Sequence, residues 1–149
     1  MDSRTFQNIL IVCMANICRS PSAEIILQSK CPALSVSSAG LKALTGTAVE
    51  VNASRQLVEN SYAVGNHVAQ QINTQMVQDS DLVLVMERYQ QHQIMRDYPA
   101  CSGKVMLLGQ WLSNQEISDP YGKSDEVFAI VFRQIEQACD VWSRKLGQA

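Results

Sequence analysis

Two observations predict that the chain folds as an α/β protein with a parallel β-sheet. Short, nearly continuous apolar runs alternate along the sequence with segments of helical periodicity, which is typical of strands connected by helices. The clearest run, "NILIVC" at 8–13, lacks the polar alternation of a half-exposed strand and suits a strand covered on both faces. No repeat, low-complexity tract or interior linker interrupts this pattern, so we expect a single domain over residues 1–149.

The remaining elements follow in chain order. Strands are predicted over 8–13, 34–40, 81–86 and 104–111. Helices are predicted over 20–30, 52–60, 87–99 and 124–146, with two short helical turns within 66–80. The helix at 20–30 has the best-marked start, because Ser20 occupies a cap position and Pro21 lies in the first turn. Pro99 ends the helix that precedes it, and the last helix is amphipathic.

Composition argues against several classes of partner. The formal net charge is −2 and no run of Lys and Arg is present, so we expect neither nucleic acid nor an anionic membrane surface as a partner. No apolar stretch approaches the ~18 residues needed to cross a bilayer, and no targeting segment is visible, which predicts no membrane insertion. The 5 cysteines include no metal-type Cys-x-x-Cys pair, which indicates free thiols in a reducing cytoplasm.

The stretch "VCMANICRSPSAE", residues 12–24, lies where the first strand ends and the first helix begins. Ligands of parallel α/β sheets bind beyond the carboxyl ends of the strands. A helix N-terminus offers unpaired N–H groups and positive partial charge, so a loop curled over it can cradle a phosphate or a similar oxyanion. Arg19 adds a planar fork for two oxygens. The same positive field favours the thiolate of Cys13, which is the nucleophilic form.

The spacing of Cys13 and Arg19 is only fairly specific by itself, because small buried cysteines are common. The strand before the loop and the helix after it strengthen the catalytic reading. Such a nucleophile needs a proton donor, since an alkoxide or phenoxide leaves phosphorus slowly unless it is protonated. Asp119 in "ISDPYG" (117–122) is the candidate, although an Asp-Pro turn taken alone is more often structural.

Together, "VCMANICRSPSAE" and "DPYGKS" resemble the low-molecular-weight protein tyrosine phosphatases. The resemblance continues through "SSAG", "NHVAQQI", "DLVLVME" and "GKVMLLGQW", so it covers nearly the whole chain. It is strongest with the bacterial branch that acts opposite tyrosine autokinases in capsule and exopolysaccharide export. It implies a three-layer α/β/α fold around a central four-stranded parallel sheet, and neither a metal nor a cofactor. It also implies a phosphotyrosine protein as substrate, with a membrane tyrosine autokinase as a candidate, and a monomer or weak self-association.

The resemblance also implies roles for the residues that match the family's motifs. Cys13 would be the nucleophile that forms a cysteinyl-phosphate, Arg19 the phosphate clamp, and Asp119 first the general acid and then the base. Ser20 would donate its hydroxyl to the Cys13 sulfur and ease departure of the thiolate. Backbone N–H groups along the rest of the loop would complete the cradle, from Met14, Ala15, Asn16, Ile17 and Cys18.

Further matching positions would support the cradle or wall the substrate slot. Asn16, Ser38 and His67 match positions whose side chains brace the loop. Leu41, in the loop after the second strand, and Tyr121 would form the walls for the substrate ring.

The sequence departs from the family pattern in places. Ala15 stands where members usually carry Gly, so we expect Asn16, and not Ala15, to take the left-handed conformation. Gly122 follows Tyr121 where animal members carry a second tyrosine, which argues against control by phosphorylation there. Gln70 stands where an arginine is frequent, which weakens any expectation of ion pairs around it.

Two alternative functions stay open on the sequence. A thiol-dependent arsenate reductase of the same fold needs two further cysteines close together, and Cys101 stands alone in its region. A catalytically inactive phosphate-binding module would not need the catalytic residues that this chain retains. Two hypotheses for Cys18 also stay open. It either traps an oxidised Cys13 as a disulfide or only packs beneath the loop.

Overall fold

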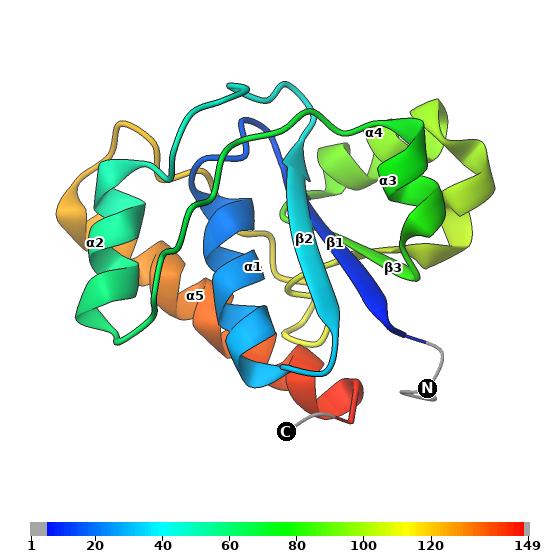
Figure 1. Ribbon diagram of the computed structural model, residues 1–149. Coiled ribbons are helices and arrows are strands. Elements are labelled where there is room, and N and C mark those ends of the chain that lie inside the picture. Colours follow the sequence, from blue (N-terminus) through cyan, green and yellow to red (C-terminus); the bar gives the residue numbers. More distant parts are fainter. Residues whose placement is uncertain (1–5, 148–149) are drawn as a thin grey trace.

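A central parallel β-sheet with helices on both faces makes up the computed structural model, which describes residues 6–147 (Figure 1). The strands are β1 (Asn8–Cys13), β2 (Ser35–Gly40), β3 (Leu82–Val85) and β4 (Val105–Leu107). They pair in the order β2-β1-β3-β4, and every pairing is parallel. The prediction of a four-stranded parallel sheet is therefore confirmed.

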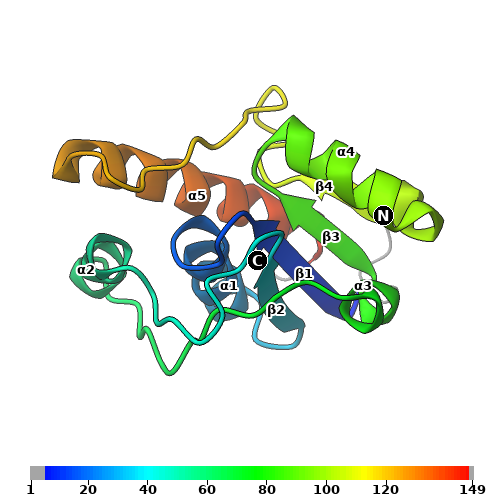
Figure 2. The same ribbon diagram turned by 90° about the horizontal axis from the view of Figure 1, so that it is seen from above.

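Helices cover the two faces unequally. They are α1 (Arg19–Lys30), α2 (Val51–Glu59), α3 (Thr74–Asp79), α4 (Arg88–Asp97) and α5 (Asp125–Lys145), with a 3₁₀-helix η2 (Pro99–Lys104) after α4. In both ribbon views α1, α2 and α5 lie on one side of the sheet, and α3 and α4 lie on the other (Figures 1 and 2). Within the described part of the chain, no helix is long and apolar enough to span a membrane.

Two hydrophobic cores explain the continuous apolar run of β1. Ile9 and Ile11 belong to the core beneath α1 and α5, whereas Leu10 and Val12 belong to the core beneath α3 and α4. Successive side chains of a strand point to opposite faces, so a strand buried on both faces needs apolar residues at every position. Cys13 ends the run on the α1 side, opposite Gly40 of β2, and so places its thiol at the carboxyl edge of the sheet.

One of the two predicted helical turns is wrong. Residues 74–79 are helical as expected, but residues 66–72 are extended along the end of β2. Gly40 N donates to Gln70 O at 2.9 Å, and Ile72 N donates to Gly40 O at 3.0 Å. Pairing with a strand edge outside its own segment overrides the local helical pattern, since propensity is a weak preference compared with tertiary contacts.

The fourth strand is shorter than the predicted 104–111. The helix η2 fills the residues before β4, and the chain turns after Leu107, where Gln110 N donates to Leu107 O at 3.1 Å. Gly109 then lies against Gln115, whose carbonyl oxygen would be only 2.2 Å from a Cβ at position 109. That close contact requires glycine and ends the strand, although the residues themselves look like a strand.

Candidate active site

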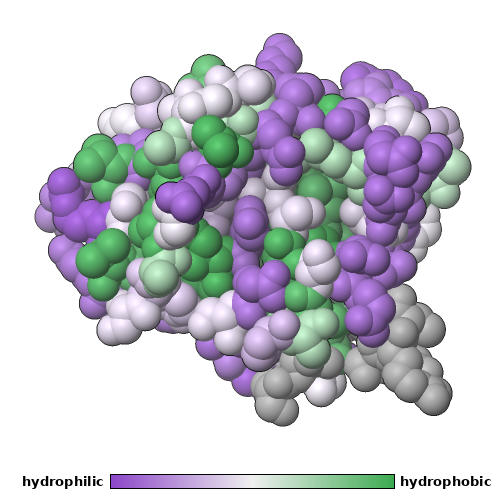
Figure 3. Space-filling model, in the orientation of Figure 1, coloured by the Kyte–Doolittle hydropathy of each residue, from purple (hydrophilic) through white to green (hydrophobic). Residues whose placement is uncertain are grey.

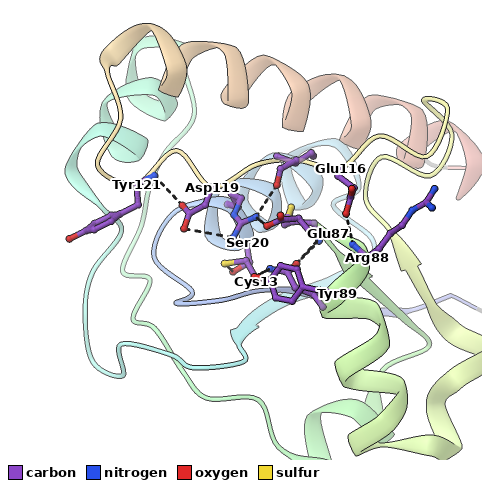
Figure 4. Close-up of polar contacts among 12 residues, drawn as sticks. Cys13, Ser20, Glu87, Arg88, Tyr89, Glu116, Asp119 and Tyr121 are labelled. Atoms are coloured by element: carbon purple, nitrogen blue, oxygen red, sulfur yellow. Dashed lines mark hydrogen bonds and ion pairs between the residues drawn. The ribbon is translucent and has the colours of Figure 1, made fainter.

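The loop that joins β1 to α1 lines a pocket at the carboxyl end of the sheet (Figure 4). Asn16 has φ 61°, whereas Ala15 is not among the residues with positive φ, so the predicted division between these two positions is confirmed. The end of β2 approaches the same loop closely. A Cβ at Gly40 would lie 2.6 Å from Met14 O, so only glycine allows this approach.

The first helix begins at Arg19, one residue earlier than predicted, and Ser20 is not its cap. Cys18 holds the N-cap position and makes no side-chain cap hydrogen bond, and the first turn of α1 contains no acidic residue. No side chain of the N-cap or of the first turn therefore neutralises the positive end of the helix dipole. An oxyanion in the pocket would meet that end and its N–H groups.

Asn16 is fully buried at the centre of a hydrogen-bond network. Its Nδ2 donates to Ser20 Oγ at 2.7 Å and to Ser38 Oγ at 2.9 Å. Its Oδ1 accepts from Gln70 N at 3.0 Å, and Ser38 Oγ donates onward to the Glu24 carboxylate. Because the amide uses both protons and its oxygen, the loop conformation is specified by the protein itself, before any ligand binds.

The extended segment 66–72 supplies two more braces to this network. His67 Nε2 lies 2.9 Å from Asn16 O, and a carbonyl only accepts, so Nε2 carries a proton and donates it. His67 Nδ1 lies 3.8 Å from Glu24 Oε1 on the other side of the ring. Gln70 Nε2 donates to Ser38 O at 2.9 Å. The segment predicted to be a helical turn therefore supports the cradle with side chains that a helix would turn elsewhere.

Ser20 connects this network to the thiol. Its Oγ lies 3.0 Å from Cys13 Sγ, and both residues are buried. The Ser20 oxygen accepts from Asn16, which leaves the single hydroxyl proton for the sulfur. Ser20 can therefore stabilise a thiolate at Cys13 by direct donation, because hydrogen bonds to charged groups are stronger than neutral ones.

Arg19 is buried and held by groups from two distant segments. Its Nη1 donates to Glu87, at the start of α4, and to Ile117 O at 2.8 Å. Its Nη2 lies 3.9 Å from Asp119 Oδ2. Burial alone would lower the pKa of the guanidinium, but Cys13, Glu87 and Asp119 outweigh it and raise the pKa above its ordinary value. Arg19 is therefore a fixed positive charge at the base of the pocket.

Asp119 and Tyr121 lie in a loop, residues 117–123, which we call the acid loop. Asp119 Oδ1 accepts from Tyr121 N at 3.0 Å, so the carboxylate fixes the turn while remaining 52% exposed. Figure 4 shows Asp119 beside Ser20 and the thiol of Cys13, with the Tyr121 ring extending outward. A half-exposed carboxylate at the opening of the pocket is suitably placed to exchange a proton with a departing group.

The pocket has a volume of about 140 Å³ and brings most of the expected residues together. Its lining comprises Cys13, Met14, Ala15, Ile17, Cys18, Arg19, Leu44, Asp119 and Tyr121. The expectation for Leu41 is wrong, because Leu41 is 7% exposed and packs in the core on the α3 side. Leu44, three residues later, provides the leucine that lines the pocket. The first residue of the loop after β2, Leu41, is therefore part of the core, and only the later residue Leu44 reaches the pocket.

Cys18 faces away from the network, toward the start of α2. Its Sγ lies 3.8 Å from Glu50 Oε2, the carboxylate that also accepts from Asn52 N and Ala53 N at the N-cap of α2. Burial, reinforced by Glu50 and Asp119, raises the pKa of the Cys18 thiol well above its ordinary value. At neutral pH Cys18 is therefore a protonated thiol.

Comparison with known proteins decides the family. A sequence profile described as "Low molecular weight phosphotyrosine protein phosphatase" matches residues 8–149. The chain belongs to this phosphatase family. The phosphatase is 42% identical over 141 residues to the probable low molecular weight protein-tyrosine-phosphatase AmsI of Erwinia amylovora, covering 95% of this chain and 98% of that one.

Solved structures agree with this assignment. The phosphatase matches the tyrosine phosphatase Wzb of Escherichia coli K30, solved in complex with sulphate, with a TM-score of 0.93 and 39% identity, over 95% of this chain and 99% of that one. It also matches the YwlE arginine phosphatase of Geobacillus stearothermophilus, with a TM-score of 0.90 and 30% identity, over 95% and 93% of the two chains. The protein is therefore a protein-tyrosine-phosphatase by family, with the four-stranded α/β fold of its relatives.

Sequence reasoning missed four residues of this phosphatase's site. Glu24 lies inside a predicted helix with no sign of a role in a site, and Gln70 stands out in the sequence only as a departure from the family pattern. Leu44 carried no signal that distinguishes it from neighbouring apolar residues. Glu87 could have been found, since it directly follows a buried strand, and the carboxyl ends of parallel strands meet at one edge of the sheet.

Proposed function

We propose that the protein hydrolyses protein phosphotyrosine through a cysteinyl-phosphate intermediate. The observation that carries this proposal is that a thiol, a buried guanidinium and a carboxylate line one pocket, from Cys13, Arg19 and Asp119. The sulphate in the related Wzb structure supports oxyanion binding in this fold, because sulphate has the charge and tetrahedral shape of phosphate.

In the first step the Cys13 thiolate attacks phosphorus opposite the tyrosine oxygen. The S–P bond forms as the P–O bond to tyrosine breaks, and Asp119 gives its proton to the departing phenolate oxygen. Arg19 and the N–H groups of the loop bind the phosphoryl oxygens as their charge is redistributed in the transition state. Because the Asn16 network already fixes these donors, little reorganisation is needed when the substrate reacts.

In the second step a water molecule attacks the phosphorus of the cysteinyl-phosphate. Asp119, now ionised, takes a proton from that water, the S–P bond breaks, and inorganic phosphate leaves. The electron pair returns to Cys13 as a thiolate, which the Ser20 hydroxyl, 3.0 Å away, stabilises by donation. The same carboxylate thus serves as acid and then as base, and no redox partner or metal takes part in either step.

The shape of the pocket supports an aryl phosphate as the substrate. The walls above the cradle include the apolar side chains of Ile17 and Leu44 and the ring of Tyr121. A phosphotyrosine carries its phosphorus one ring's length farther from the backbone than phosphoserine does, so it can reach the thiol between these walls. Aromatic contact with Tyr121 adds roughly 0.5–1.5 kcal/mol. The guanidinium of phosphoarginine, the substrate suggested by the name of YwlE, would have to lose its hydration against the same apolar walls.

A bacterial tyrosine autokinase of the cytoplasmic membrane is the phosphotyrosine protein that we propose as substrate. The support is the similarity to AmsI and Wzb and the resemblance to the capsule and exopolysaccharide branch of the family. This proposal also places the phosphatase in the cytoplasm. Incubation of the Cys13→Ser variant with a lysate should capture such a kinase, and wild-type protein should release it.

Acid-quenched reactions with a phosphotyrosine peptide labelled with ³²P test the mechanism. Wild-type protein should retain label on Cys13, and Cys13→Ala, which has no nucleophile at this position, should retain none and lose turnover. Cys31→Ala, which removes a buried thiol outside the pocket, is the matched control and should label like wild type. Turnover without a labelled protein would overturn the covalent mechanism. Faster turnover of phosphoarginine, or of arsenate with thioredoxin, than of phosphotyrosine would overturn the substrate assignment.

A further inference from the structure

We propose that an apolar rim at the opening of the pocket selects phosphotyrosine sites that are flanked by aliphatic or aromatic residues. This inference rests on the proposed function, because the occupant of the rim is the polypeptide whose phosphotyrosine fills the pocket. The apolar rim consists of four exposed side chains, namely Leu44, Val51, Val68 and Tyr121. Leu44 and Tyr121 line the pocket itself, whereas Val51 and Val68 lie outside its lining, on segments that are hydrogen-bonded to the pocket loop.

The rim is unusual for its exposure. Its four side chains are 51%, 65%, 55% and 62% exposed, and they make up half of the 8 large hydrophobic side chains that are exposed among residues 6–147. Single exposed apolar side chains are normal on a soluble protein, but a group of them beside a pocket marks a binding surface. Figure 3 shows hydrophobic residues over α2 and over the loops that cross the top of the molecule in that view.

Two rim residues are carried by segments bonded directly to the cradle loop. Leu44 N donates to Ala15 O at 3.1 Å, and Glu50 N, just before Val51, donates to Ile17 O at 2.8 Å. Ala15 and Ile17 both line the pocket. Leu44 and Val51 therefore lie within one residue of main-chain contacts to the pocket wall, and their positions are fixed relative to it.

Val68 is held beside them by its two neighbours. His67 Nε2 is hydrogen-bonded to Asn16 O at 2.9 Å, and Ala69 N donates to Thr47 O at 2.8 Å. Both flanking residues are largely buried, whereas the valine between them faces solvent. The loop that carries Leu44 and the extended segment that carries Val68 thus run side by side at the pocket.

The opposite side of the opening carries mostly charged side chains, together with the ring of Tyr89, which is 45% exposed. Figure 4 shows Glu87, Arg88 and Glu116 across the pocket from Tyr121, with Glu116 Oε1 accepting from Arg88 N at 2.7 Å. A peptide whose phosphotyrosine enters the pocket must pass over the opening, and its residues follow at about 3.3 Å intervals when extended. Residues one to three positions from the phosphotyrosine therefore reach the rim, and the rim favours apolar side chains at these positions.

Two phosphotyrosine peptides of equal length and charge test this selection. One carries Val and Leu at the two positions on each side of the phosphotyrosine, and the other carries Ser there. The readout is the ratio of the two kcat/KM values, measured on one enzyme preparation. The fraction of active enzyme cancels in this ratio. Partial burial of two aliphatic side chains is worth roughly 10-fold in this ratio, so wild type should prefer the aliphatic peptide by about that factor.

The variant with Val51→Ser and Val68→Ser should lower the ratio to about 2-fold. Val58→Ser is the matched control, since Val58 is also on α2 and 62% exposed but lies two helical turns, about 10 Å, beyond Val51. The control should keep the wild-type ratio. A ratio near 1 in wild type, or an unchanged ratio in the double variant, would overturn the proposed selectivity of the rim while leaving the proposed function intact. Hydrolysis of neither peptide would overturn the proposed function and the rim with it.

Discussion

The cradle and the acid loop contribute to one pocket but are built in opposite ways. The polar side chains of the cradle are almost inaccessible, with exposures of 0% for Asn16, 2% for Arg19 and 0% for Ser20. In the acid loop, the Asp119 side chain is 52% exposed and Tyr121 is 62% exposed. Within the described residues, no buried side-chain nitrogen or oxygen lacks a hydrogen-bond partner, so the cradle is polar and yet fully satisfied.

This difference separates two energetic roles. A buried polar network contributes to stability only while every member is paired, and removing one member leaves the others unsatisfied at about 1–3 kcal/mol each. An exposed loop is solvated in either case, so its side chains can be changed at little cost to folding. Substitutions in the buried polar network of the cradle should therefore reduce both stability and activity, whereas substitutions of the exposed Asp119 and Tyr121 in the acid loop should reduce activity alone.

Asp119→Ala should give the largest loss of turnover with almost no change in melting temperature. General acid catalysis contributes about 10²–10⁴-fold, so kcat on a phosphotyrosine peptide should fall by that factor. The loss should be smaller on p-nitrophenyl phosphate, because its leaving group needs less protonation. The measurements are kcat on both substrates and the melting temperature.

Asp125→Ala is the control for Asp119→Ala, because Asp125 is 76% exposed and also carries a negative charge in the nearby start of α5. It should leave kcat within about 2-fold of wild type, as surface substitutions usually do. An equal loss of kcat on both substrates would contradict the role of Asp119 as general acid. A large fall in melting temperature for Asp119→Ala would contradict the expectation that the acid loop acts on activity and not on stability.

Asn16→Ala should reduce stability and activity together. It removes hydrogen bonds to Ser20, Ser38 and Gln70 and places alanine at φ 61°. We expect a loss of roughly 3–5 kcal/mol in the free energy of unfolding, about 10 °C in melting temperature, and at least about 10-fold in kcat. Denaturant unfolding and steady-state kinetics measure the two effects.

Asn114→Ala is the control that distinguishes the stability lost with the hydrogen-bond network from the stability lost through backbone strain. Asn114 also has a positive φ, 56°, but it is exposed and lies in the turns that follow β4, where its backbone N donates to Gln110 O. Its replacement should therefore cost only the strain of the left-handed conformation, about 1–2 kcal/mol, without loss of kcat. If the two variants lost equal stability, the buried network around Asn16 would contribute nothing.

Glu87→Gln should have a smaller effect that is confined to the phosphate clamp. The change removes the charge that faces the Arg19 guanidinium, while Ile117 O still accepts from Arg19. A looser guanidinium should lower kcat/KM by about 10–100-fold for every phosphate monoester, because transition-state binding depends on its geometry. Glu116→Gln is the control, since Gln keeps an oxygen for Arg88 N, and it should leave kcat/KM unchanged. Equal losses in the two variants would show that Glu87 acts only through local charge.

The comparison also explains what could be predicted from sequence. The residues of the cradle lie within one short stretch, so the strand before it, the helix after it and the motif between them locate Cys13 and Arg19. The position of Glu87 directly after a buried strand places it at the same edge of the sheet, but its pairing with Arg19, 68 positions away in the chain, is not visible in any local pattern. The segment 66–72 was wrongly predicted for the same reason, because its shape is set by pairing with Gly40 and not by its own periodicity.

The boundary between core and pocket was the least predictable feature. Leu41 and Leu44 are identical side chains three residues apart, and each is compatible with the core or with the pocket on sequence grounds. The backbone decides between them: Leu41 N donates to Cys13 O and Leu44 N to Ala15 O, so the chain crosses the cradle between these points. Such a crossing depends on the positions of two loops and is not encoded in either loop alone.

Cys18→Ser should have the smallest effect, visible only after oxidation. Cys18 belongs to the cradle, yet its thiol points to Glu50 and its elevated pKa keeps it protonated, so its removal should hardly change kcat in reducing buffer. Peroxide should oxidise the Cys13 thiolate to a sulfenic acid and release hydroxide, which takes a proton from solvent to become water. Attack by Cys18 sulfur would then form a disulfide and release a second water, and dithiothreitol would restore both thiols.

The elevated pKa of Cys18 makes this trapping slow at neutral pH, because the attacking sulfur must first lose its proton. The fraction of activity recovered with dithiothreitol after peroxide should therefore rise with pH in wild type. In Cys18→Ser the recovered fraction should be lower and should not rise with pH in this way. The reason is that the sulfenic acid has no resolving thiol and proceeds to irreversible forms. Cys101→Ser, which changes a cysteine in the core beneath α3 and α4, should recover like wild type. Equal recovery in wild type and Cys18→Ser at every pH would assign Cys18 a packing role alone.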